Sequence, residues 1–422
     1  MVRARQLGSA SLGALILAAA VGCASGPAGG PTAPATTPNA AAAPAAFAAI
    51  GPEYRVVDSV VGLDTPLGVA VSPDGEFLYV SGGNGDATGI ARLDGRTDEV
   101  AWLGDGLGAP GGIDTSADGA VWATSRADDA LAISRDEGGT WERVDAETGG
   151  FVGATSVAAE GEFVAVTNAG GDSVSISLDG GSSWSVQAPE GVFAAPAGAA
   201  ITAEGLLAVV NSADGSVALS ADDGRTWERI GADVTGMVAP EAIAAGPAGE
   251  LYAADPGAGA LSRSVDGGRT WYPSAGFGDV AGVGVGPDGL VYVTDGFDTL
   301  AVLEAIPGPV SEATAEWSGD ALVVGWAPPA VSGGSPLTSY VLTAEPAFTD
   351  EEWAAFAAEL SEAELADLAD AWRFEVDPGE SAGGAVEATI ADLPDGRAVR
   401  LTLVALNEVG ASETTILEVS AR

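Results

Sequence analysis

Four segments of the chain repeat one eight-residue pattern, Ser-x-Asp-x-Gly-x-Thr/Ser-Trp, and this repetition limits the possible folds more than any other feature. The segments are residues 134–141, 177–184, 220–227 and 264–271. Their closing tryptophans, at positions 141, 184, 227 and 271, follow one another at intervals of 43, 43 and 44 residues. Such regular self-similarity indicates an array of like units, each of which buries its apolar surface against its neighbours.

Each conserved residue type of this pattern, called the Ser-x-Asp turn below, suits a tight hairpin turn. An aspartate carboxylate accepts backbone N–H groups within a turn, and glycine adopts positive φ without steric cost. The tryptophan then begins the next strand and buries a large area. We therefore predict that the aspartates of the pattern are structural and not catalytic.

A second pattern, in which two short apolar strands flank a turn, occurs six times and is called the Asp-Gly turn below. Its glycines are Gly75, Gly119, Gly161, Gly205, Gly249 and Gly289, spaced 44, 42, 44, 44 and 40 residues apart. Short strands at this spacing are typical of the four-stranded blades of a β-propeller.

The last repeat supplies only three strands, which end near residues 299–304. Residues 54–59 have no repeat of their own and are similar to the outer strand at residues 141–145. We expect this segment to pair with the last repeat, because such closure leaves no free sheet edge. The sequence thus predicts an all-β fold with a six-bladed β-propeller over residues 51–306.

The Ser-x-Asp turn resembles the Asp-box (BNR) repeat of sialidase-like propellers. Sialidases of that kind use three arginines, a Tyr/Glu nucleophile pair and an aspartic acid, with a Phe/Tyr-Arg-Ile-Pro motif in the first blade. Here residues 54–57 read Tyr-Arg-Val-Val and lack the proline. Most arginines of the propeller lie in or beside the turns, and Arg126 is the main one left elsewhere. We therefore expect no sialidase activity.

Ligands of propellers usually bind at the mouth opposite these two kinds of turn. A polar or acidic residue follows the second strand of every blade on that side. The candidate ligand residues are Asn84, Asp86, Arg126, Asp128, Asp129, Asn168, Asp172, Asn211, Asp214, Asp255, Asp295 and Asp298. Gathered in a ring, they suit a cation such as calcium or a polyhydroxylated ligand. The alternative is that these asparagines and aspartates simply form turns.

Residues 1–22 have the pattern of a signal peptide, with Arg3 and Arg5 before a short apolar stretch. The sequence Ala-Val-Gly-Cys that ends at Cys23 resembles a bacterial lipobox. Cys23 is the single cysteine, so we predict that it carries a diacylglycerol anchor on the extracellular face of the cell membrane. An ordinary cleaved signal peptide is the alternative. Residues 23–50 are rich in alanine and proline and predict a disordered linker.

Residues 307–422 resemble a fibronectin type III domain. Trp326 matches the core tryptophan of the second strand, and residues 393–412 match the final hairpin. Val399 stands where the family has tyrosine, which removes a corner hydrogen bond. Residues 347–374 show helical spacing and predict an inserted pair of short helices. This insertion either binds a partner or packs on the sandwich or the propeller.

The charge and the residue types limit the function. The chain has 16 basic and 60 acidic residues, a net charge of −44 and no histidine. Such a surface repels nucleic acid, so we exclude nucleic acid as a partner. Without histidine, no Ser-His-Asp triad and no histidine-ligated zinc site can form.

Together these features favour a non-enzymatic, monomeric binding or scaffolding lipoprotein that takes a glycan or protein ligand. We expect no cofactor, with calcium as the exception left open. The alternative is an extracellular carbohydrate-active hydrolase, a glycosidase with paired carboxylates at the propeller mouth. The composition, rich in alanine, glycine and arginine but without lysine, indicates a GC-rich genome such as that of an actinobacterium.

Overall fold

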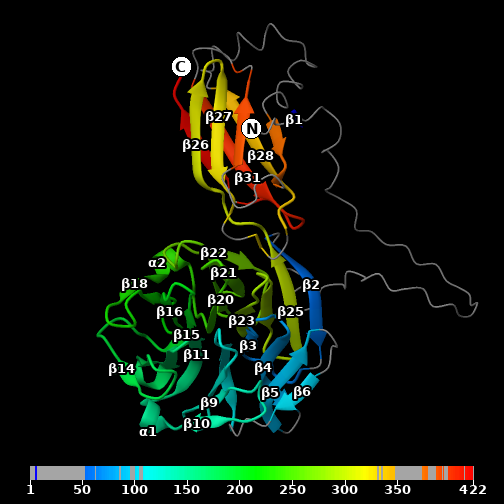
Figure 1. Ribbon diagram of the computed structural model, residues 1–422. Coiled ribbons are helices and arrows are strands. Elements are labelled where there is room, and N and C mark those ends of the chain that lie inside the picture. The colour runs from blue at the N-terminus through cyan, green and yellow to red at the C-terminus, as the bar shows by residue number, and fades with distance from the viewer. Residues whose placement is uncertain are drawn as a thin grey trace, which may run out of the picture.

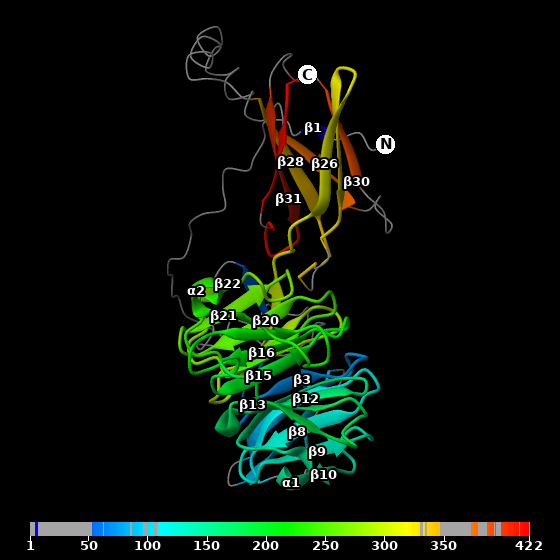
Figure 2. The ribbon, with the colours of Figure 1, turned by 90° about the vertical axis from the view of Figure 1, so that its left-hand side faces the viewer.

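The chain folds into a disc of small β-sheets and a two-layered β-sandwich, which Figures 1 and 2 show from two sides. The computed structural model describes residues 5–6, 53–61, 63–84, 87–95, 100–103, 108–329, 332–333, 336–346, 373–378, 386–391, 393, 398–412 and 414–421. Cys23, the linker, the predicted insertion up to residue 372 and most of the predicted signal peptide lie outside these residues.

Within residues 54–305 the described chain forms six antiparallel sheets of four strands each, numbered here as sheets 1 to 6. Sheet 1 contains β3 (Val69–Val71), β4 (Phe77–Asn84), β5 (Ala87–Asp94) and β6 (Val100–Leu103). Sheet 2 contains β7 (Pro110–Thr115), β8 (Val121–Ser125), β9 (Ala130–Ser134) and β10 (Glu142–Val144). Sheet 3 contains β11 (Ala154–Glu160), β12 (Phe163–Asn168), β13 (Ser173–Ser177) and β14 (Ser185–Gln187).

The other three sheets repeat this order. Sheet 4 contains β15 (Pro196–Ile201), β16 (Leu207–Asn211), β17 (Val217–Ser220) and β18 (Glu228–Ile230). Sheet 5 contains β19 (Ala242–Ala245), β20 (Leu251–Asp255), β21 (Ala260–Ser264) and β22 (Tyr272–Ala275). Sheet 6 contains β23 (Gly282–Val285), β24 (Val291–Thr294), β25 (Thr299–Ala305) and, from the chain's beginning, β2 (Tyr54–Val61).

The sheets close into a ring. The innermost strands β3, β7, β11, β15, β19 and β23 contact one another in that order, and β23 contacts β3. The predicted pairing of the two ends is confirmed, because β2 lies antiparallel to β25 with Tyr54 opposite Ala305 and Asp58 opposite Val302. This closed, nearly all-β arrangement is a β-propeller.

Both faces of each sheet are buried against neighbouring sheets, which explains the nearly continuous apolar strands. All five residues of β8 are buried. On one side Trp122 packs with Leu131 of its own sheet and Val164 of sheet 3. On the other side Val121 packs with Tyr79 of sheet 1. Complete burial of a side chain such as Leu131 stabilises the fold by roughly 1.5–3 kcal/mol.

The four Ser-x-Asp turns have the predicted hairpin structure. In the first, Asp136 Oδ1 accepts the Thr140 N–H at 2.7 Å, and Asp136 Oδ2 accepts the Thr140 hydroxyl at 2.8 Å. Gly138 has φ 88°, and its N–H donates to Ser134 Oγ at 2.8 Å. These aspartates therefore serve the turns in which they lie.

Short helices occupy a few connections of the propeller. They are α1 (Ala146–Gly149), α2 (Ala232–Thr235) and the 3-10 helix η2 (Ala169–Gly171). The carboxylate of Asp145 caps α1 by accepting the Thr148 N–H. In the described part of the chain, no helix has the length and apolarity needed to cross a membrane.

The sandwich packs a three-stranded sheet on a five-stranded sheet. The first contains β26 (Ser311–Ser318), β27 (Ala321–Ala327) and β30 (Val386–Ile390). The second contains β28 (Ser339–Pro346), β29 (Arg373–Val376), β31 (Val399–Leu406), β32 (Thr415–Val419) and the two-residue β1 (Arg5–Gln6), which pairs with β29.

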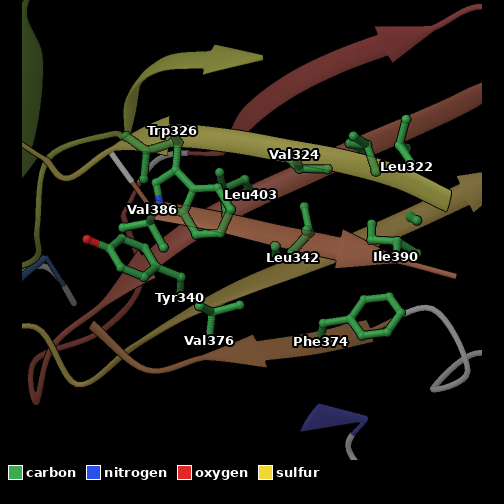
Figure 3. Packing of buried hydrophobic residues seen from close by; sticks show 14 of the residues in the cluster. Leu322, Val324, Trp326, Tyr340, Leu342, Phe374, Val376, Val386, Ile390 and Leu403 are labelled. Carbon is green, nitrogen blue, oxygen red and sulfur yellow. The ribbon is translucent and has the colours of Figure 1, made fainter. Parts of the chain in front are cut away.

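Trp326 lies at one end of the sandwich core, where its ring meets that of Tyr340 edge to face at 5.4 Å (Figure 3). The helical insertion was predicted to extend to residue 374, but Arg373 and Phe374 belong to β29. Phe374 and Val376 alternate with exposed positions and point into the core, so the period of two applies from Arg373 onward.

Candidate functional site

A channel runs through the centre of the propeller between the innermost strands. Its cavity of about 260 Å³ opens between the Asp-Gly turns, beside Pro73, Pro247 and Pro287. Small side chains and backbone line most of it. Asp114 and Glu160 are the ionisable residues among the described residues that line it.

Asp114 belongs to the innermost strand β7 and is half-buried. Its Oδ2 accepts the N–H of Ala159 in the next sheet at 2.9 Å, and its Oδ1 accepts the N–H of Thr115 at 2.8 Å. Burial raises the pKa of Asp114 to about 7, although these two hydrogen bonds act in the opposite direction. Burial, aided by the charge of Asp118, also raises the pKa of Glu160.

A second hollow, of about 360 Å³, lies at the opposite mouth of the channel and is called the upper mouth below. Its polar side chains are Arg126, Thr155, Ser212 and Glu241, and glycine and alanine residues complete it. The hydroxyl of Thr155 lies within 3.1 Å of the Pro196 carbonyl oxygen, and that of Ser212 donates to the Ala195 carbonyl at 3.0 Å. The Thr155 hydroxyl also lies 2.8 Å from the Thr167 hydroxyl, so it is engaged within the protein. The Ser212 oxygen keeps lone pairs that can accept from a ligand.

The upper mouth is built from two structurally equivalent positions of sheets 2 to 5. One position follows the second strand by one residue and places Arg126, Ala169 and Ser212 at the hollow. The other lies on the innermost strand, two residues before the residue that pairs with the third-last residue of the second strand, and places Thr155, Ala197 and Glu241 there.

Of the predicted ligand residues, Arg126 lines the upper mouth. Two others form ion pairs beside it on the same face, Asp128 with Arg143 and Asp214 with Arg229. The side chain of Asn84 and the whole of Asp86 lie outside the described residues.

The remaining predicted residues hold loops together through backbone groups. Asp129 accepts the Ala154 N–H at 3.0 Å, and Asp172 accepts the Ala195 N–H at 2.7 Å, so each joins one sheet to the next. Asp255 is fully buried and accepts the N–H groups of Val238, Ala239 and Ala258.

The same holds for the other four. Asn168 and Asn211 are fully buried and accept the N–H groups of Val152 and Ala194. Asp295 accepts the N–H groups of Phe297, Asp298 and Thr299, and the carboxylate of Asp298 accepts the Thr299 hydroxyl. These contacts are the ones that the turn-forming alternative requires.

Glu241, Thr155, Ser212, Asp114 and Glu160 are the residues that sequence reasoning missed. A signal was present for two of them. Glu241 is the only charged residue at its position of the six repeats, where the others are Leu67, Gly111, Thr155, Ala197 and Ala281. Asp114 stands where the other repeats have alanine or glycine. Within the described residues, no three Cys, Asp or Glu side chains gather as a group that could hold a metal ion.

No protein-family model matches the chain, and no curated protein sequence matches it. Among solved structures, a streptogramin B lyase is similar at 16% identity and a TM-score of 0.45, over 60% of this chain and 98% of that chain. A gluconolactonase from Xanthomonas campestris is similar at 14% identity and a TM-score of 0.49, over 62% and 93%. A PQQ-bound aldose sugar dehydrogenase from Streptomyces coelicolor is similar at 18% identity and a TM-score of 0.41, over 59% and 97%.

Proposed function

We propose that the protein is a non-enzymatic, lipid-anchored binding protein of the extracellular membrane face, with the upper mouth as its ligand site. In this proposal Cys23 carries the lipid, residues 24–50 form a spacer, and a six-bladed Asp-box propeller presents the ligand face. A fibronectin type III-like sandwich accompanies it, and the protein acts as a monomer. The observation that carries the proposal is the upper mouth itself, a hollow of about 360 Å³ with polar side chains of both signs.

The junction between propeller and sandwich supports a scaffolding role. The backbone N–H and C=O of Ala305 bond to the sandwich, through the Gly333 carbonyl at 2.8 Å and the Asn407 amide at 2.8 Å. Those of Ile306 bond to the propeller, through the Glu53 carbonyl at 2.9 Å and Arg263 Nη1 at 3.2 Å. Because all four backbone groups are bonded, Ala305 and Ile306 hold the propeller and the sandwich in one orientation.

Gly333 is required for this contact. It has φ 81°, and a Cβ there would lie 2.1 Å from the Ala305 carbonyl oxygen.

Binding to the purified full-length protein, in detergent, tests the proposal on arrays of glycans and peptides with and without calcium. We expect binding without turnover, and loss of binding in Arg126→Gln or Glu241→Gln. Mass spectrometry of the membrane-extracted protein tests the anchor, which Cys23→Ser removes. Absence of any ligand that depends on the upper mouth contradicts the binding function.

One observation favours the alternative function, a glycoside hydrolase. Asp114, with its pKa raised to about 7, lines the channel together with Glu160, and a carboxyl whose pKa lies near neutral pH suits a general acid. A screen of chromogenic glycosides decides between the two functions. Hydrolysis that is lost in both Asp114→Asn and Glu160→Gln supports the hydrolase, and turnover unaffected by these changes rules out this pair.

A further inference from the structure

Two opposite charges face each other across the upper mouth, and each breaks the symmetry of the repeats. At the position equivalent to that of Arg126, sheets 1 to 6 have Gly83, Arg126, Ala169, Ser212, Pro256 and Gly296. Arg126 is the only charged residue of that set, as Glu241 is of its own set. Sheets 2 and 5, which carry them, are three steps apart in the closed ring and therefore lie on opposite sides of the channel.

Neither charge has a partner within the part of the chain that the structure describes. Among the described residues, no hydrogen bond or ion pair reaches the guanidinium of Arg126 or the carboxylate of Glu241, and both residues are exposed. Other exposed arginines of the same face do have partners, since Arg143 pairs with Asp128 and Arg229 with Asp214. In a chain with 60 acidic residues, an arginine left unpaired at a hollow is available to a ligand.

The backbone beside Arg126 makes room for its side chain at the mouth. A Cβ on Gly111 would lie 3.0 Å from Arg126 Cγ and 3.1 Å from Arg126 Nε. Gly111 occupies in sheet 2 the position that Glu241 occupies in sheet 5. The smallest residue of that set therefore stands in the sheet that carries the arginine, and a larger one would push the guanidinium away.

We propose that the upper mouth binds a short peptide with free ends, its carboxylate on Arg126 and its ammonium group on Glu241. This inference rests on the proposed binding function and names its ligand class. A ligand that is anionic throughout meets the field of a chain with net charge −44, whereas a zwitterion carries no net charge and is oriented by the two sites. The hollow of about 360 Å³ falls within the size range of small-ligand pockets.

The polar groups between the two charges suit a peptide backbone. Thr155 and Ser212 line the hollow, and the Ser212 hydroxyl, which donates to the Ala195 carbonyl, can accept a peptide N–H group. Between them the surface is alanine and glycine, which leaves space for side chains of varied size. A divalent cation is disfavoured, because calcium takes roughly 6–8 oxygen ligands and Glu241 is the one carboxylate that lines the hollow in the described chain.

The test uses a degenerate tetrapeptide library in three forms: free ends, acetylated N-terminus and amidated C-terminus. The full-length protein is incubated with each form, and mass spectrometry identifies the retained peptides, whose affinity is then measured by calorimetry. We expect free-ended peptides to bind at least tenfold more tightly than either capped form. Arg126→Gln removes the preference over amidated peptides only, and Glu241→Gln removes the preference over acetylated peptides only.

Two further variants separate the site from general effects. Gly111→Ala leaves both charges in place and is expected to weaken binding by displacing Arg126, whereas Arg143→Gln, on the same face, leaves binding unchanged. Equal retention of free and capped peptides, or no retention, overturns the inference. Saccharide binding at the upper mouth in place of peptide overturns it as well, but leaves the proposed binding function standing; absence of every ligand removes both.

Discussion

Arg263 Nη1 donates a hydrogen bond of 3.2 Å to the carbonyl oxygen of Ile306, at the point where the chain leaves the propeller. In three other sheets the position before the turn serine is Ile133, Ile176 or Leu219. These aliphatic side chains lie against the turn glycine of the next sheet. Sheet 6 has no Ser-x-Asp turn, because its third and fourth strands come from opposite ends of the propeller. Arg263 thus stands where the other sheets make an apolar contact, and it binds the backbone of Ile306 instead.

Arg263→Met is expected to loosen the junction, since the Ile306 carbonyl loses its donor. A hydrogen bond from a charged donor contributes about 1.5–3 kcal/mol, so the free energy of unfolding should fall by up to that amount. Small-angle scattering should show a broader distance distribution, because the sandwich then moves against the propeller. Arg225→Met, which changes an exposed arginine paired with Asp223, is the control. Identical scattering of the two variants would show that Arg263 does not fix the junction.

The Ser-x-Asp turns should make the propeller sensitive to acid. Hydrogen bonds from the hydroxyl and the backbone N–H of Thr226 hold the pKa of Asp222 below its ordinary value. A lowered pKa contributes stability above the unfolded pKa, and that stability is lost as the pH falls toward the folded pKa. Asp222→Ala is therefore expected to lower the Tm at pH 7 and to differ less from the parent at pH 3.

Glu190→Ala, an exposed position outside the turns, should change the Tm little at either pH. A deficit of Asp222→Ala that stays constant from pH 7 to pH 3 would contradict the role of the ionised carboxylate.

The repeats made much of the architecture predictable. Each Ser-x-Asp turn contains its own hydrogen-bond partners, so a local sequence determines a local structure, as Asp136 and Thr140 show. The pairing of β2 with β25 was predictable because the last repeat lacked a strand. The candidate ligand residues were less predictable. Asp129 and Asp255 accept N–H groups of loops 16 to 25 residues away, and only the folded ring shows that these side chains serve the scaffold.

The partners and the burial of Asp114 could not be predicted from the sequence. A carboxyl within an innermost strand could face either the channel or a neighbouring sheet, and its contact with Ala159 comes from sheet 3, 45 residues away. Comparing the six repeats position by position would have singled it out, but its partners and its burial depend on how two sheets pack.

The burial of Asp114 gives a pH dependence of the opposite sign to that of Asp222. The pKa of Asp114 is raised from 3.8 to about 7 in the folded protein, so the folded state binds more protons than the unfolded state between these two pH values. Stability is therefore lost as the pH rises through about 7. The full titration corresponds to about 4 kcal/mol. Asp114→Ala removes this loss, so urea unfolding should show the variant gaining stability relative to the parent between pH 5 and pH 8. A difference that does not change with pH would show that Asp114 is not protonated in the folded protein at pH 5.

A buried glutamate in sheet 5 replaces a pair of residues found in sheet 2, and the exchange can be reversed. Residues 116–120 read Ser-Ala-Asp-Gly-Ala, and residues 246–250 read Gly-Pro-Ala-Gly-Glu. In both turns the first N–H donates to the last carbonyl oxygen. In sheet 2, Ser116 Oγ donates to Asp118 at 2.5 Å. In sheet 5, Glu250 is 1% exposed, accepts the Ala248 N–H at 3.0 Å and fills the space beside Gly246, where a Cβ would lie 2.1 Å from Glu250 Oε1.

Burial raises the pKa of Glu250, and Oε1 has no hydrogen-bond partner among the described residues. The raised pKa means that stability falls as the pH rises through it. Gly246→Ser combined with Ala248→Asp rebuilds the serine–aspartate contact of the sheet 2 turn and leaves no room for the carboxylate, which should move into water. Carbon-13 NMR should then show the pKa of Glu250 falling toward its ordinary value, and the free energy of unfolding at pH 8 should rise by about 1 kcal/mol, the value of one hydrogen bond. An unchanged pKa of Glu250 in this variant would show that the glutamate is held by contacts other than the missing serine and aspartate.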